Sequence, residues 1–163
     1  SIFLISGAIS LRYEMVGLVR EPAVGLAKPV LPMLIWLTLF VLIAGTIVTG
    51  SGPHAGDEQA QRFGFDPRVV SWLHADLVIA LLVLTSMLFL ITRQIGLTII
   101  NKRVGLFLVI CLAQGLVGYV QYFTGLPVVL VAIHLLGATL VWVSGWSLVK
   151  VADSGYKLKG FHL

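Results

Sequence analysis

Two histidines lie within long apolar runs of the sequence. His74 belongs to the run that begins at Ser71, and His134 to the run that begins at Pro127. An ionisable side chain inside a membrane-spanning segment is costly and is usually functional. Neutral imidazole is a good axial ligand for haem iron, so two imidazoles at one depth predict a haem held edge-on between helices. One such histidine alone is equally well explained by an interhelical hydrogen bond, whereas the pair favours a cofactor.

The composition places this chemistry in a membrane. Of the 163 residues, 58% are hydrophobic and 11% are charged, and the mean hydropathy is +1.02, which excludes an ordinary soluble domain. The formal net charge of +4 does not indicate nucleic acid, because Lys and Arg cluster between the apolar runs. Membrane lipid is therefore the expected partner. The single cysteine, Cys111, lies inside an apolar run, where we expect it to serve packing.

Four membrane-spanning helices must position the histidines. A helix that crosses the hydrocarbon core needs about 20 residues. The apolar runs predict helices over 31–49, 67–91, 103–123 and 127–150. The predicted fold is an all-α polytopic membrane four-helix bundle over 31–150. We interpret 1–30 as the end of a preceding transmembrane helix (1–11) with a cytoplasmic connector, and 151–163 as a cytoplasmic tail.

The basic residues predict how these helices are oriented. The following lie on one side of the predicted helices: Arg12, Arg20, Lys28, Arg93, Lys102, Arg103, Lys150, Lys157 and Lys159. Only Arg62 and Arg68 lie on the other side. By the positive-inside rule both ends of the chain are cytoplasmic. The second and fourth helices then both enter from outside, and each carries its histidine about seven residues, or about 10 Å, from its start. The chain therefore reads as two helical hairpins of similar plan.

Small and polar residues accompany the histidines. Gly137 and Ala138 follow His134 by about one turn, where their size would leave room for a flat porphyrin. On the third helix Gln114, Gly118 and Gln121 recur at helical spacing and predict an inward polar face. Close helix packing with interhelical hydrogen bonds explains the same face equally well.

Other polar groups offer competing interpretations. A zinc or copper site would need three or four ligands, and only Asp76 accompanies the histidines at matching depth. Asp76 follows His74 by two residues and so points to nearly the opposite side of the helix. We interpret it as an interhelical hydrogen-bonding group, as a group facing a part of the protein outside this chain, or as a proton carrier. Arg68 is a candidate for contact with haem propionates or an interfacial anchor, and His54 is a loop histidine or a metal contact.

Taken together, these residues resemble the haem A synthase family, and more narrowly the C-terminal half of its bacterial members. The resemblance covers nearly the whole chain from the first to the fourth helix. It rests on the run 48–57, His74, Gln114 with Gly118, the turn 124–127 and the run 132–138.

The resemblance implies an oxidoreductase of eight helices in two pseudo-symmetric halves, which oxidises a methyl group of haem O to the formyl group of haem A. The N-terminal half of the family carries a glutamate three residues before its first histidine, and many bacterial members have a cysteine pair in the outer loop. Here Ser71 stands three residues before His74, and the outer loop has no cysteine. The chain therefore resembles the C-terminal half, which binds haem b, with His74 and His134 as the axial ligands and no catalytic residue of its own.

The same resemblance implies the surroundings of the chain. It predicts a bacterial cell membrane, the N-terminal half of the same protein as a partner, and haem O synthase or terminal-oxidase assembly factors as further partners. Two other functions fit the residues. One is a stand-alone b-type cytochrome subunit of a quinone-linked complex, and the other is a small transporter or assembly factor whose two histidines are polar links without a cofactor.

Overall fold

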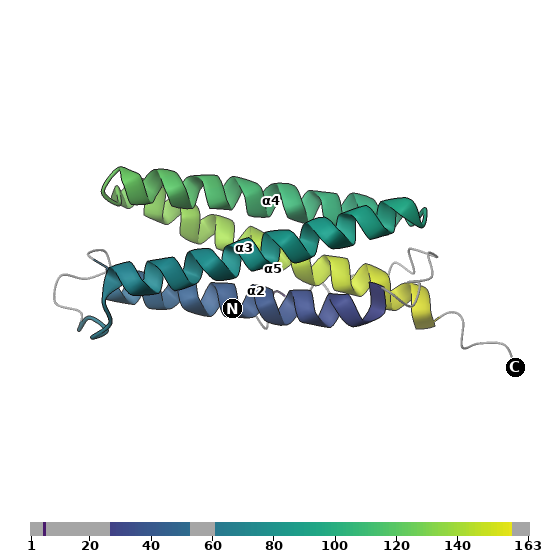
Figure 1. Ribbon diagram of the computed structural model, residues 1–163, viewed down its shortest axis with the longest axis horizontal. Helices are drawn as coiled ribbons and strands as arrows, with labels where there is room; N and C mark the ends of the chain where they lie inside the picture. Colours follow the sequence, from purple (N-terminus) through teal and green to yellow (C-terminus); the bar gives the residue numbers. More distant parts are fainter. Residues whose placement is uncertain (1–4, 6–26, 53–60, 158–163) are drawn as a thin grey trace, which may run out of the picture.

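A computed structural model describes Ile5, residues 27–52 and residues 61–157 of the protein, and the described residues form four long helices. They are α2 (Ala27–Ser51), α3 (Pro67–Gln94), α4 (Thr98–Phe123) and α5 (Val128–Lys157) (Figure 1). Each contains a stretch long and apolar enough to cross a membrane. The prediction of an all-α four-helix membrane bundle is confirmed. Of the predicted preceding helix over 1–11 only Ile5 is described, and His54 and residues 158–163 of the predicted tail lie outside the described residues; residues 151–157 of that predicted tail belong to α5.

The helices are arranged so that each packs against two others. Helix α2 packs against α3 and α5, and α4 packs against α3 and α5. In the described part of the chain, α3 and α5 make no direct backbone approach to each other and lie at diagonally opposite corners. The two helices that carry the histidines therefore face each other across the interior of the bundle.

The connection between α3 and α4 is shorter than the sequence predicts. We expected a connector that included 95–100 and a helix that began near Arg103, whereas α4 begins at Thr98. Gly96 adopts a φ of 77°, and the amide of Leu97 donates to the carbonyl of Thr92 at 3.0 Å. This is a glycine-terminated helix end, in which the left-handed glycine reverses the chain and the following amides bond to the last carbonyls of the helix. Three residues therefore suffice to connect α3 to α4.

A side-chain amide also fixes this connection. Asn101, in the first turn of α4, donates through Nδ2 to the carbonyl of Phe89 at 2.8 Å and to Oγ1 of Thr92 at 2.9 Å. Asn101 is a polar residue in an apolar run, and its bonds to α3 hold the start of α4 against the end of α3.

The remaining helix ends lie close to the predicted ones. Helix α2 begins at Ala27 instead of residue 31 and continues to Ser51, and the apolar part of α5 ends at Lys150 while the helix itself continues to Lys157. At the other end of α4, Gly125 has a φ of 79°, and the amide of Leu126 donates to the carbonyl of Gln121 at 2.7 Å. The tight turn expected at 124–127 is confirmed.

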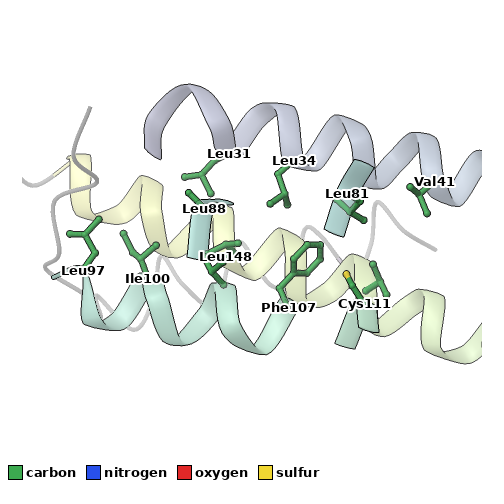
Figure 2. Packing of buried hydrophobic residues seen from close by; sticks show 12 residues of the cluster. Leu31, Leu34, Val41, Leu81, Leu88, Leu97, Ile100, Phe107, Cys111 and Leu148 are labelled. Carbon is green, nitrogen blue, oxygen red and sulfur yellow. The ribbon is translucent and has the colours of Figure 1, made fainter. Parts of the chain in front are cut away.

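The buried side chains gather in one half of the bundle. We call this half the core half. It contains the starts of α2 and α4, the end of α3 and the end of the apolar part of α5. The histidine half contains the opposite helix ends. Figure 2 shows the side chains of the core half meeting between the helices. The buried cluster consists of Leu31, Leu34, Val41, Leu81, Leu88, Leu97, Ile100, Val104, Phe107, Cys111, Val141 and Leu148. Cys111 thus serves packing, as expected.

Polar groups within the core half bond to their own helix. Thr38, Thr85 and Thr92 are fully buried, and each hydroxyl donates to the carbonyl four residues earlier at 2.7–2.9 Å. Such bonds remove the cost of a hydroxyl in an apolar interior. Outward side chains such as Phe40, Val109 and Leu116 are more than half exposed and contact lipid.

Replacing Phe107 tests the packing of the core half. The side chain of Phe107 is fully buried, and a Cβ placed on Gly145 of α5 would lie 3.0 Å from its ring. Phe107→Ala should leave a cavity and lower the free energy of unfolding by about 3 kcal/mol. The matched variant Phe123→Ala, at a 77% exposed position of the same helix, should change it by less than about 0.5 kcal/mol. Unfolding in mixed detergent micelles measures both, and equal shifts would contradict the proposed core.

Candidate cofactor site

His74 lies on the inner face of α3 against α2. A Cβ placed on Gly45 would lie 3.2 Å from Cε1 of the imidazole, so the absent side chain of Gly45 is what admits the ring. Nδ1 lies 3.1 Å from the carbonyl oxygen of Val41. Because a carbonyl only accepts, Nδ1 carries the hydrogen in this bond. The lone pair of the neutral imidazole is therefore on Nε2, which is the arrangement of a metal-ligating histidine whose other nitrogen is bonded to the backbone.

His134 occupies a matching place in the other hairpin. It lies on α5 against Gly118 of α4, where a Cβ would lie 3.4 Å from Cε1 of the ring. Its Nδ1 is buried and has no hydrogen-bond partner within the described part of the chain. In each hairpin, therefore, one imidazole lies against a glycine of the paired helix. The two hairpins are alike in this respect.

His74 lies on α3 and His134 on α5, so the two imidazoles come from opposite corners of the bundle. Packing around them is loose. Within residues 27–52 and 61–157, burial in the histidine half beyond Ala44, Leu81, Cys111 and Gly137 is limited to Ser51. The α2–α3 and α4–α5 hairpins diverge toward this half, at the left of Figure 1. The histidines therefore lie where the two hairpins separate.

Two glutamines of α4 also turn into this region. Gln114 fills the space beside Gly137, where its side-chain amide occupies the position that a Cβ would take. Oε1 of Gln114 and Oε1 of Gln121 are buried without a hydrogen-bond partner among the described residues. Buried polar atoms are nearly always bonded, so unbonded ones in the half of the bundle that holds the imidazoles point to a missing polar or ligating group. The space beside Gly137 is taken by Gln114, and Ala138 is half-buried one residue further along.

The other candidate residues are less closely tied to the imidazoles. Arg68 is exposed in the first turn of α3, and its backbone amide donates to Oδ1 of Asp66 at 2.8 Å, which caps the helix. Asp76 is exposed on the outer face of α3. In the described ranges no three residues among His, Cys, Asp and Glu come together as metal ligands. Contact of Arg68 or Ala138 with a cofactor remains a prediction.

Sequence reasoning missed Val41 and Gly45, which complete the surroundings of His74. A glycine within an apolar helix signals the close approach of a neighbouring helix or side chain. Nothing in the sequence marks the backbone carbonyl of Val41 as the acceptor of the bond from Nδ1 of His74. Comparisons of the chain with protein-family models, with curated proteins and with solved structures found no match. The resemblance to haem A synthases therefore rests on the residues quoted for it.

The contact between Gln114 and Gly137 can be tested by adding one methyl group. Gly137→Ala should displace the amide of Gln114 and lower the free energy of unfolding by about 1 kcal/mol. Gly115→Ala is the matched control, because nothing lies near a Cβ at that position, and it should be neutral or mildly stabilising. Adding Gln114→Ala to Gly137→Ala should restore the free energy of unfolding, because the displaced amide is then absent. A double-mutant cycle without coupling would contradict the contact.

Proposed function

We propose that this chain is a haem b-binding membrane domain in which the imidazoles of His74 and His134 would hold the iron. The observation that carries the proposal is the bond from Nδ1 of His74 to the carbonyl of Val41, because it leaves Nε2 as the free lone pair of a neutral imidazole. The second imidazole on the diagonally opposite helix and the buried, unbonded polar atoms of α4 and α5 favour a ligand between the hairpins.

The residues of the histidine half fit a haem. Two imidazoles on diagonal helices supply two nitrogen ligands, and the two glycines facing them keep the rings close to α2 and α4. No third ligand of the kind that zinc or copper requires accompanies them in the described part of the chain. When bound, such a haem supplies one-electron transfer at a coordinatively saturated iron. The protein orients the ligands, excludes water with its apolar surroundings and sets the basicity of each imidazole.

By its resemblance, the domain is further proposed to be the C-terminal half of a haem A synthase-like oxidoreductase in a bacterial cell membrane. Ser71 supports this assignment, because the family has glutamate at that place in its catalytic half. The domain would then support, electronically or structurally, the oxidation of haem O to haem A in the other half. The coding sequence upstream of Ser1 tests this: a four-helix half with glutamate three residues before a histidine favours the synthase, and its absence favours the stand-alone cytochrome.

Replacing the ligands tests the haem proposal directly. The purified wild-type chain should show the reduced-minus-oxidised bands of a six-coordinate low-spin haem b. His74→Ala and His134→Ala should each lose most of the haem, measured as haem per protein by the pyridine haemochrome. His162→Ala, in the C-terminal tail, is the matched control and should keep it. A full complement of haem with an unchanged low-spin spectrum in either ligand variant would defeat the assignment, and a wild-type protein without haem bands would favour the polar-link alternative.

The orientation is tested by reporter fusions. With Lys and Arg concentrated on one side, a reporter that is active only outside the cytoplasm should be active when inserted in the loop 52–61 and inactive when fused after Leu163. A cytoplasmic reporter at the same two positions should show the reverse pattern. Activity of the first reporter at the C-terminal end would contradict the proposed orientation.

A further inference from the structure

The outer face of α3 carries one acidic residue within an apolar stripe. Asp76 is exposed, and it has no hydrogen bond or ion pair within the described ranges. The stripe around it recurs every three or four residues, and each of its large side chains is more than half exposed. These side chains are Val69, Trp72, Ile79, Val83, Met87 and Leu90. A single carboxyl group therefore interrupts a surface that otherwise suits lipid.

The carboxyl group lies at hydrocarbon depth. Helix α3 has 28 residues, so its midpoint falls between Ala80 and Leu81, and Asp76 lies about 7 Å from it at 1.5 Å per residue. The hydrocarbon core extends about 15 Å to each side of its centre. Acidic groups at such depth are costly, and they almost always face a protein interior or pair with another group. Exposure to lipid alone does not account for Asp76.

Asp76 is also separate from the candidate haem site. It follows His74 by two residues, about 200° around the helix, and His74 faces inward against Gly45. The position two residues after His134 is Leu136, which is 68% exposed. The α4–α5 hairpin therefore has no equivalent carboxyl, and the feature belongs to one outer face only.

We propose that the outer stripe of α3 is the contact surface for a membrane-spanning helix outside this chain. That helix presents a cationic side chain to Asp76. Charge complementarity carries the proposal, since a cation at that depth would neutralise the carboxylate and bond to it. A second copy of the chain fits less well. Copies in one membrane run parallel, so a symmetric pair would place Asp76 against Asp76 at the same depth, without a cation between them.

The experiment uses the full chain in lipid vesicles with a synthetic transmembrane peptide. The peptide is a polyleucine helix with one arginine at the depth of Asp76, and an all-leucine peptide is its control. Energy transfer between the labelled chain and peptide measures association. The arginine peptide should bind the wild-type chain about tenfold more tightly than Asp76→Leu, the change expected from an interhelical bond in a membrane. Asp76→Asn keeps the side-chain size and should repeat the loss, whereas Val83→Leu in the same stripe should bind as the wild type does.

Two results would overturn the proposal. Equal binding of the arginine peptide to the wild type and to both Asp76 variants would show that the carboxyl does not recruit a cation. Energy transfer between labelled copies of the wild-type chain that is lost in Asp76→Leu would show that the stripe contacts a second copy. The haem content of Asp76→Leu should stay at the wild-type level, so the outcome is independent of the proposed haem function.

Discussion

The cost of an unbonded polar group in hydrocarbon divides this bundle into two different halves. In the core half the buried threonine hydroxyls bond to their own helix, and Asn101 bonds across to Phe89 and Thr92. In the histidine half His134, Gln114 and Gln121 each bury a polar atom without a partner in the described residues. A folded protein retains such atoms for a reason, because each costs free energy that better packing would save. The core half supplies the stability that allows the other half to remain incomplete.

Glycine is what allows polar side chains between these helices. In the histidine half Gly45 faces the ring of His74, Gly118 faces the ring of His134, and Gly137 faces the amide of Gln114. In the core half Gly145 faces Phe107 in the same way. Helices in a membrane gain little from burying apolar surface against each other, so close contact over small residues is a main source of their association. The same device thus builds an apolar core at one end and a polar site at the other.

The four spans were predictable because hydropathy reports on membrane crossing directly. The start of α4 was not, since Asn101, Lys102 and Arg103 looked like a loop, whereas Asn101 bonds to α3 within the bundle. The face of α2 that meets His74 was also hidden. Helix α2 is apolar on all sides, so no periodicity tells which of its faces turns inward. The bond to Val41 depends on that rotation, and a backbone carbonyl leaves no trace in a sequence.

Each hairpin places a glycine against its imidazole, but the hairpins differ at the residue four positions before that glycine, on the glycine's own helix. There α2 has Val41, whose carbonyl accepts the bond from Nδ1 of His74, and α4 has Gln114. Nδ1 of His134 and Oε1 of Gln114 are both buried and unbonded, on neighbouring levels of the α4–α5 contact. A hydrogen bond to Nδ1 raises the basicity of a histidine ligand. Under the proposed function the two ligands therefore differ in their surroundings, because Nδ1 of His74 is bonded to the backbone and Nδ1 of His134 has no partner among the described residues.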